Sequence, residues 1–541
     1  MNTASPLRAI LSIVMLAALP VAVAGSDPHG QSGMPTFQTS DRCLACHNGL
    51  TSAAGENVSI GADWRTSLMA NSSRDPYWQA SVRRETIEHS VAGGSIEDEC
   101  SVCHMPIPRY EAKLAGHPGA VFAHLPLQVN ADRKASDGVS CSVCHQITPE
   151  NLGQTASFNG QFVIASPDSQ GAHAEFGPFD IDAGLMQVMR TSTDGYQPTR
   201  GDQIRSSELC ASCHTLITKA LGPDGNVIGS LPEQVPYQEW LHSEYRDQRS
   251  CQSCHMPAVR GTAPITRVLG EEREGVARHQ FVAANFMMQR VFSRHHDELA
   301  AVASPEEFAA AADRTVSYLQ SQAVRLSVSA PRVINKRVQA DISVENLGGH
   351  KLPTGFPSRR AWLHVTVRDS SHRVVFESGA LNADGSIQGN ANDTDPARYE
   401  PHYSEIREPD EVQIYESILE DSKGGVTTGL LSAVGYVKDN RLLPHGFDKT
   451  TATAEIAVHG GALTDQGFTD RGQRLRYSVD AGGAAGPFEI EAQLWYQPIG
   501  YRWAQNLKAY DAREIQRFSG YFESAGAATA TLLATAVAAS Q

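Results

Sequence analysis

The sequence predicts a multi-domain protein in which a mainly α-helical, loop-rich domain is followed by an all-β sandwich domain. Two observations predict this division. All ten cysteines of the 541-residue chain lie between residues 43 and 255, in copies of one short motif. After residue 323, apolar and polar residues alternate with the period of half-buried strands. A chain of this length also exceeds the usual size of one domain.

Residues 1–24 have the features of a secretory signal peptide. Arg8 is the only charged residue among them, and the run from Ile10 to Ala24 is mostly apolar and ends in small residues. The alternative is an uncleaved membrane anchor, but the run is shorter than the about 20 residues that a membrane-spanning helix needs. We therefore expect an exported protein whose first domain occupies residues 25–300.

Each cysteine in that domain belongs to a Cys-x-x-Cys-His motif, which is the attachment signature of c-type haem. The two thiols form thioethers with the haem, and the histidine becomes the proximal iron ligand. The attachment residues are Cys43, Cys46, Cys100, Cys103, Cys141, Cys144, Cys210, Cys213, Cys251 and Cys254. The proximal histidines are His47, His104, His145, His214 and His255.

Other chemistries of paired cysteines fit this pattern poorly. A four-cysteine zinc site combines two Cys-x-x-Cys units, so five units cannot all be paired, and zinc does not require a histidine after each unit. Thioredoxin-like redox motifs occur singly, and a disulfide framework has no reason to repeat one spacing. The sequence therefore predicts five covalently attached haem c groups, each with its iron, in a pentahaem cytochrome c domain.

A connecting helix is predicted over residues 301–322. Ser304 is a suitable N-cap, Pro305 suits the first turn, and Glu307 completes a capping box.

The β-sandwich domain is predicted over residues 323–505. Val324, Leu326 and Val328 alternate with polar residues, and similar runs recur up to Tyr496. This region has no cysteine and therefore no haem of its own. The remaining segment, 506–541, is rich in Ala and Thr near its end and is expected to be a small packed or frayed segment rather than an anchor.

Each iron needs a sixth ligand or leaves a site open. The chain has 20 histidines, of which five are proximal. Sequence context favours His124, His242 and His279 as distal ligands; the alternative for each is a surface or core histidine. The reserve candidates are His89, His117, His173, His295 and His296.

Two further candidates come from resemblance. The stretch Trp64–Ala70 resembles the Trp-x-x-Ser-x-His-Ala element of multihaem cytochromes related to cytochrome c-554, in which the histidine is a distal ligand. Met69 occupies that position here. The resemblance implies that the Met69 thioether is an axial ligand, which would raise the potential of that haem. The alternative is a core methionine that fills a gap.

The second element is the loop Asn346–Gly355, which contains Gly-His-Lys-Leu-Pro-Thr-Gly. It resembles a loop that recurs in multihaem cytochromes with an appended β-domain. The resemblance implies that His350 reaches back from the sandwich to a haem; the alternative is a turn in which His350 only packs. As a whole, the mature chain resembles an exported multihaem cytochrome of the c-554-related group with a C-terminal β-sandwich.

Two classes of function follow. The first is electron transfer through five haems in the periplasm or at the outer cell surface. The alternative is a multihaem oxidoreductase that acts on a small nitrogen or sulfur compound at a haem with an open distal site. No catalytic residue is assigned, because the chain has no Cys-x-x-Cys-Lys variant that would support a nitrite-reductase-like site. The β-domain is also a candidate for docking a partner or a surface.

The net charge of the chain limits the classes of binding partner. The formal net charge is −15, which argues against nucleic acid and favours positively charged partners. We expect redox partner proteins, either other cytochromes or a membrane quinol-oxidising or outer-membrane complex. No membrane span is expected after cleavage of the signal peptide.

Overall fold

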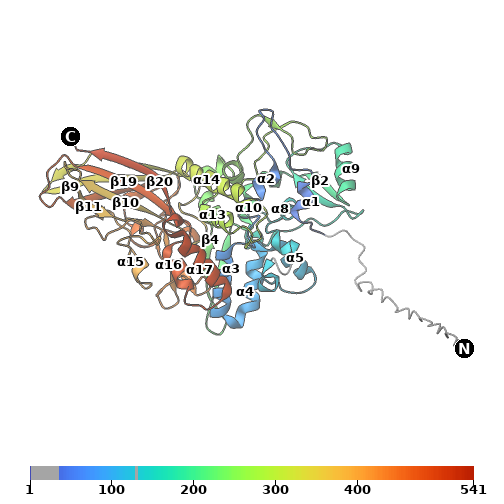
Figure 1. Cartoon of the computed structure of the whole chain (residues 1–541), viewed down its shortest axis with the longest axis horizontal. Coiled ribbons are helices and arrows are strands. Elements are labelled where there is room, and N and C mark those ends of the chain that lie inside the picture. Colours follow the sequence, from blue (N-terminus) through green and yellow to red (C-terminus); the bar gives the residue numbers. More distant parts are fainter. Residues whose placement is uncertain (2–35, 128–131, 541) are drawn as a thin grey trace.

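The computed structural model describes Met1, residues 36–127 and residues 132–540. Nearly all of the predicted signal peptide therefore lies outside the described residues. The cysteine-bearing part is built from short helices and loops, and the long strands lie at the opposite end of the molecule with the C-terminus (Figure 1). The predicted division into a helical, loop-rich part and a strand-rich part is present.

The cysteine-bearing part has little regular structure between its helices, as its Gly- and Pro-rich sequence predicts. Its α-helices within the described residues are α1 (Ser40–Leu44), α2 (Ile60–Trp64), α3 (Pro76–Glu88), α4 (Gly93–His104), α5 (Pro106–Leu114), α7 (Arg133–Ser136), α8 (Cys141–His145), α9 (Ala183–Ser192), α10 (Ser207–Ala211), α11 (Pro236–Leu241), α12 (Cys251–His255) and α13 (Phe286–Arg294). Its strands form three two-stranded sheets: β1 (His173–Gly177) with β2 (Tyr196–Arg200), β3 (Leu216–Leu221) with β4 (Val227–Gln234), and β5 (Thr262–Ala263) with β6 (Arg273–Glu274).

The predicted connecting helix is α14 (Pro305–Gln322). Its capping box is formed as predicted: the Ser304 hydroxyl accepts from the Glu307 amide, and the Glu307 carboxylate accepts from the Ser304 amide. The helix packs against α13, where the rings of Phe292 and Phe308 stack with their centres 5.2 Å apart. Both rings are fully buried, so α14 belongs to the core rather than to an exposed linker.

Two sheets follow α14. The strand order of the first is β11-β10-β19-β20, with β13 also paired to β10, and that of the second is β12-β18-β9-β7, with β17 and β8 on its flanks. The main strands are β7 (Val324–Val328), β9 (Arg337–Asn346), β10 (Arg360–Arg368), β11 (Val374–Ser378), β18 (Gly472–Asp480), β19 (Glu489–Gln497) and β20 (Thr531–Ala539). The short strands are β8 (Arg332–Ile334), β12 (Glu405–Ile406), β13 (Ile414–Tyr415) and β17 (Phe468–Thr469).

Burial alternates along these strands as the sequence predicts. In β9 every second residue is buried, from Val338 to Asn346. The apolar side chains among them share one core with the inward residues of β10 and β19 from the other sheet, such as Val365 and Leu494. The same core continues to Phe286 of α13, so the strand-rich and cysteine-bearing parts are packed together through a common interior.

A third, three-stranded sheet extends this contact. It consists of β14 (Ser417–Asp421), β15 (Val426–Thr427) and β16 (Ala433–Asp439), in the order β15-β14-β16. The Tyr436 hydroxyl of β16 donates to the carbonyl of Pro232 in β4 at 2.6 Å. Beside it, Leu231 of β4 packs with Leu419 and Ala433.

The segment 506–541 has more structure than its composition suggests. It contains α17 (Arg513–Ala525), which packs on α3 through Phe518 and Tyr77, with ring centres 4.9 Å apart. It ends in β20, which pairs antiparallel with β19 and completes the first sheet. The strand-rich region therefore continues beyond residue 505, because Ala and Thr fill an edge strand whose larger neighbours supply the apolar surface. The remaining helices of this region are α15 (Ala391–Thr394) and α16 (Tyr501–Leu507).

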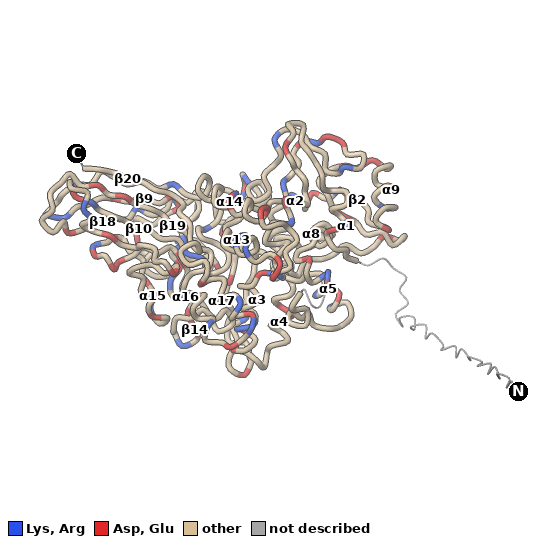
Figure 2. The backbone as a smooth tube through the Cα atoms, in the orientation of Figure 1, with Lys and Arg blue, Asp and Glu red and all other residues tan. Residues whose placement is uncertain are grey.

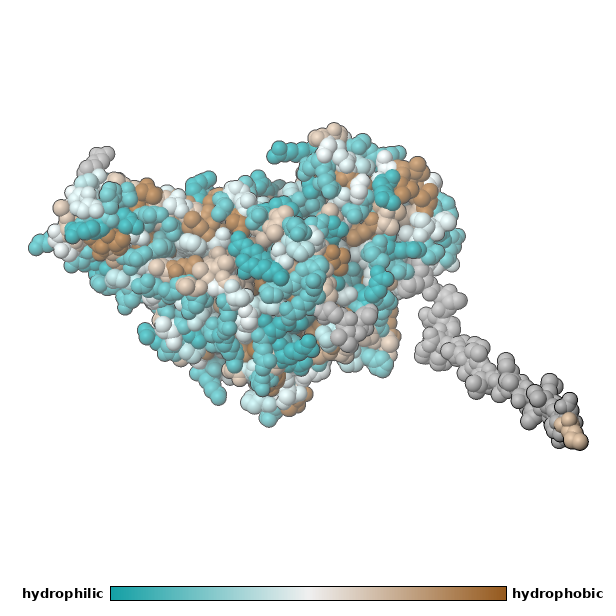
Figure 3. All heavy atoms as spheres, in the orientation of Figure 1, coloured by the Kyte–Doolittle hydropathy of each residue, from teal (hydrophilic) through white to brown (hydrophobic). Residues whose placement is uncertain are grey.

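The surface is polar and mixed in charge. In the described part of the chain, no helix combines the length and the apolar composition needed to cross a bilayer. Acidic and basic residues are interspersed over the whole described chain (Figure 2). The face shown in Figure 3 is mostly hydrophilic, with apolar side chains in small separate patches.

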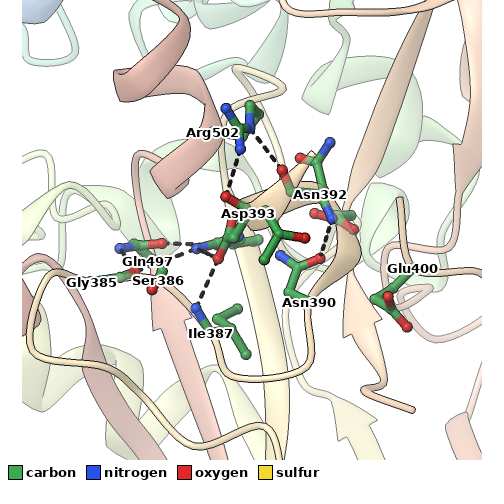
Figure 4. A network of polar contacts seen from close by, with 12 residues as sticks. Gly385, Ser386, Ile387, Asn390, Asn392, Asp393, Glu400, Gln497 and Arg502 are labelled. Carbon is green, nitrogen blue, oxygen red and sulfur yellow. Dashed lines mark hydrogen bonds and ion pairs between the residues drawn. The ribbon is translucent and has the colours of Figure 1, made fainter. Parts of the chain in front are cut away.

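A buried ion pair fixes the loop that precedes α15. Arg360, at the start of β10, donates to both oxygens of Asp393 at 2.7 and 3.0 Å, and both side chains are almost completely buried. Asp393 also accepts from the amide of Ile387 at 2.8 Å, and Arg502 donates to its carbonyl oxygen at 2.5 Å (Figure 4). Arg360 completes its contacts by donating to Gln497.

We expect Asp393→Asn to lower the free energy of unfolding by about 3–5 kcal/mol, because it leaves the Arg360 charge buried without its counter-ion. Denaturant unfolding followed by far-ultraviolet circular dichroism measures the change. Asp410→Asn, at an exposed position, is the matched control and should change the value by less than about 0.5 kcal/mol. Equal values for the two variants would contradict the prediction.

Candidate haem-binding sites

Each Cys-x-x-Cys-His motif lies on a short helical turn. Helices α8 and α12 are themselves motifs, α4 ends in the second motif, and α1 and α10 contain the first cysteine of theirs. A helical turn brings residues three and four apart to the same face, so both thiols and the histidine of a motif lie together. All ten cysteines are free thiols and half-buried.

The motifs lie in contact with one another. The thiols of Cys43 and Cys141 lie close enough to shift each other's pKa, which raises that of Cys43 and lowers that of Cys141 and places the first motif beside the third. The same holds for Cys210 and Cys251 of the fourth and fifth motifs. Cys213 of the fourth motif contacts Cys103 of the second.

The third and fourth motifs are linked as well. Burial, and then the nearby thiol of Cys213, raise the pKa of Cys144 to about 12. All five motifs thus form one continuous cluster with the fourth at its centre, an order that the spacing along the chain does not reveal.

One arrangement is used twice in this cluster. The Ser40 hydroxyl accepts from the amide of Cys141 at 3.3 Å, and the Ser207 hydroxyl accepts from the amide of Cys251 at 3.1 Å. Ser40 lies three residues before Cys43 of the first motif, and Ser207 lies three residues before Cys210 of the fourth. The first and third motifs are therefore packed in the same way as the fourth and fifth. The sequence analysis did not identify these serines, although the shared Ser-x-x-Cys spacing is visible in it.

Four of the five motif histidines use Nδ1 to contact a backbone carbonyl oxygen. The contacts are His47 to Ile265 at 2.6 Å, His104 to Ser72 at 3.1 Å, His145 to Phe176 at 2.6 Å and His255 to Val282 at 2.5 Å. A carbonyl only accepts, so Nδ1 carries the proton and the lone pair is left on Nε2, the atom available to a metal.

Burial keeps these imidazoles neutral. It lowers the pKa of all five motif histidines, and it lowers those of His104 and His255 to about 4. A neutral imidazole is the form that binds a metal. The rings are therefore in the correct protonation state at neutral pH without further rearrangement.

Two motif histidines face a second histidine. The rings of His145 and His279 are nearly parallel, with centres 6.3 Å apart and planes inclined by 15°. Those of His255 and His350 are 6.2 Å apart and inclined by 16°. Metal–imidazole bonds of about 2 Å on both sides of one ion separate two ring centres by about 6 Å. Both pairs therefore fit an iron held between two imidazoles.

The second histidines of these pairs also use Nδ1 to contact a backbone carbonyl oxygen. Nδ1 of His279 contacts the carbonyl of Ala277 at 3.2 Å, and Nδ1 of His350 contacts the carbonyl of Lys351 at 2.9 Å. Burial, and then repulsion by His145, lower the pKa of His279 to about 4. The structure thus brings two of the predicted distal ligands to the third and fifth motifs.

The other three motif histidines have different surroundings. Within the described ranges, no second histidine ring faces His47, His104 or His214. His104 instead stacks on Trp78 of α3, with ring centres 4.4 Å apart and planes inclined by 3°. This contact covers the face of the ring and leaves its Nε2 edge free.

The remaining predicted ligands lie as follows. Nδ1 of His124 is 2.5 Å from the carboxylate of Asp132. Nε2 of His242 is 3.0 Å from the carbonyl of Asp448, and the ring packs on Phe447. Neither ring is brought against a motif histidine.

Met69 is half-buried, and its carbonyl accepts from the amide of Val139 at 2.9 Å. This contact places its backbone beside the segment that enters the third motif at Cys141. Its role as a ligand stays a prediction.

Comparison with known proteins shows a likeness of fold. No family model matches the chain, and no curated protein matches it. The solved structure of a penta-haem cytochrome c552 from Thermochromatium tepidum superimposes with a TM-score of 0.53 and 17% sequence identity. The match covers 93% of this chain and 99% of that chain, so the two share a fold over almost their whole length.

Proposed function

We propose that this chain is an exported c-type cytochrome that binds five haems covalently and transfers electrons between redox partners. The observation that carries the proposal is the proximity of all five motifs in one cluster. Haems attached to neighbouring motifs are themselves neighbours, which is the condition for rapid transfer between them. The shared fold with a penta-haem cytochrome supports the proposal over nearly the whole chain.

The haem supplies the one-electron chemistry, and the chain attaches, orients and shields it. The cysteine thiols of each motif would form the thioether links. The carbonyl contacts of Nδ1 fix the orientation of the proximal rings and raise their strength as ligands. Burial of the rings excludes water from their surroundings, which lets the protein tune the potentials.

Several finer features belong to the same proposal. We place the chain in the c-554-related group, with the strand-rich part as a β-sandwich domain and the periplasm or outer cell surface as its location. Its partners would be other cytochromes or a membrane quinol-oxidising or outer-membrane complex. The polar surface and the absence of a bilayer-crossing helix among the described residues agree with this setting.

A second candidate function is an oxidoreductase that acts on a small nitrogen or sulfur compound. It is favoured by His47, His104 and His214, which face no second histidine in the described part of the structure. An iron at one of these motifs has an open distal site unless Met69 or another residue occupies it. The spin state of the irons separates the two functions, since an open site gives a high-spin haem.

We expect the mature protein to contain five haems per chain, because each motif has both thiols and its histidine. Intact mass spectrometry under denaturing conditions counts them, since thioether links survive denaturation. Replacing both Cys43 and Cys46 with alanine should remove the mass of one haem only. Four or fewer haems in fully matured wild-type protein would refute the count.

We expect His279→Ala and His350→Ala each to convert one low-spin haem to high-spin, because each removes one of two facing imidazoles. Electron paramagnetic resonance of the oxidised protein measures the high-spin signal as a fraction of total haem, expected to rise by one fifth over the wild type in each variant. Added imidazole should restore the low-spin state. His372→Asn, at an exposed position that is not a ligand candidate, is the control and should leave all signals unchanged.

Met69 supplies a separate prediction. If its thioether binds an iron, the oxidised wild-type protein shows a methionine charge-transfer band in near-infrared magnetic circular dichroism. Met69→Ala should abolish that band, and Met69→His should keep the haem low-spin and lower its potential. A high-spin haem in the wild type without such a band would exclude Met69 and favour the oxidoreductase.

A further inference from the structure

The loop that carries His350 crosses from the strand-rich part to the fifth motif. It follows β9, and its own main chain returns to the strand-rich part at Leu352, which exchanges two backbone hydrogen bonds of 2.9 Å with Leu442. Between these points, His350 lies on a turn with few internal bonds; the Asn346 side chain donates to the His350 carbonyl at 2.7 Å. The position of His350 relative to His255 must therefore be set by contacts with the cysteine-bearing part.

Tyr245 makes one of those contacts, since its hydroxyl donates to the carbonyl of Leu347 at 3.0 Å. A single buried acid makes two more. Glu239 of α11 is fully buried, and its Oε2 accepts from the amide of Lys351 at 3.1 Å and from the hydroxyl of Thr354 at 2.5 Å. The first of these donors is the residue directly after His350. Helix α11 is fixed in turn to the fourth motif, since Gln238 accepts from Thr215, the residue after His214.

The charge of Glu239 is balanced by a buried group of four ions. Its Oε1 is 2.9 Å from the guanidinium of Arg441, which also pairs with Asp439 at 2.7 Å. The ammonium of Lys351 donates to Asp439 at 2.8 Å. Burial alone would raise the pKa of Asp439, but Arg441 and Lys351 hold it well below its usual range. The group has two acids and two bases, so removing any member leaves a buried charge unpaired.

The facing histidine at the third motif is held by a similar but separate contact. His279 follows Arg278, whose guanidinium donates to both oxygens of Asp63 at 2.5 and 2.9 Å. Asp63 is buried on α2, and α2 is joined to the first motif by a hydrogen bond from the amide of Gly61 to the carbonyl of His47. In both cases a residue adjacent to the facing histidine is bound by a buried carboxylate on a helix of the cysteine-bearing part.

We infer that Glu239 is a positioning residue that holds His350 against the metal site of the fifth motif, and that Asp63 does the same for His279 at the third. The inference rests on the proposed function, since it takes the facing histidines as iron ligands. Neither acid contacts the imidazole that it positions. Each acid fixes the residue next to the histidine. The imidazole ring is therefore held at ligand distance before the metal binds.

The test uses the full-length protein with its haems attached. Loss of a contact to the metal ligand itself weakens metal binding by about 10- to 100-fold, and for a contact one residue away we expect the lower end, about 10-fold. In Glu239→Ala, we expect the concentration of free imidazole that displaces half of His350 to fall by about that factor. Electron paramagnetic resonance should show the change in one haem of five, with a shifted low-spin signal before imidazole is added. Asp63→Asn should affect a different single haem, the one altered by His279→Ala.

A matched control separates positioning from general loss of stability. Glu416→Gln removes the charge of another buried acid, which pairs with Lys438 at 3.0 Å, and does not contact the His350 loop. It should lower the unfolding midpoint yet leave the imidazole titration of all five haems as in the wild type. Glu239→Asp, which keeps the charge but shortens the reach, should recover only part of the wild-type titration.

Two results would overturn the inference, and a third tests its premise. The positioning role is refuted if Glu239→Ala binds imidazole no more readily than Glu416→Gln, or if its change spreads evenly over all five haems. If instead His350→Ala keeps every haem low-spin and does not alter imidazole binding, the ligand assignment itself fails.

Discussion

The structure depends on one constraint, which is that an imidazole must be buried and still keep Nε2 free. A buried polar ring without a partner is costly, so Nδ1 needs an acceptor that cannot also claim the second nitrogen. Backbone carbonyls meet this need at four of the five motif histidines. Because the acceptors Ile265, Phe176 and Val282 lie far along the chain from the rings they bind, the constraint also folds distant segments around the motifs.

The same constraint explains why the strand-rich part packs tightly against the cysteine-bearing part. The His350 ring faces His255 from a loop that is hydrogen-bonded to Glu239 of α11, and a core that runs from α13 into both sheets joins the two parts. The C-terminal segment strengthens this union, with α17 on α3 and β20 in the first sheet. A rigid junction is what the proposed ligand role of His350 requires, since small displacements would remove its ring from ligand distance.

The motifs are arranged as a branched cluster, as shown by which motif lies beside which. The fourth motif touches the second and the fifth, and it also lies beside the third, which leads to the first. In the proposed function, a haem at the fourth motif could therefore exchange electrons with haems at three neighbouring motifs, and the haems would not form a simple line. The two preformed imidazole pairs lie at the third and fifth motifs, and therefore on different branches from the centre.

The sequence by itself determined the attachment chemistry, because Cys-x-x-Cys-His is a local motif whose three functional side chains are brought together by one helical turn. It also determined α14, through the capping box at Ser304, and the strands after residue 323, through their alternation. These are short-range effects that neighbouring residues decide. The role of the Ala- and Thr-rich end was not predictable, because β20 is stabilised by its pairing with β19 rather than by its own side chains.

Only the tertiary structure decided which histidines face one another. His124, His242, His279 and His350 were similar candidates in sequence, yet only the last two lie opposite motif histidines, at separations of 134 residues (His145 to His279) and 95 residues (His255 to His350) in the numbering of the chain. The buried acids Asp63 and Glu239 had no sequence signal at all. Their partners are distant in the chain, and the physical reason is that a buried charge acts through the groups that surround it in space.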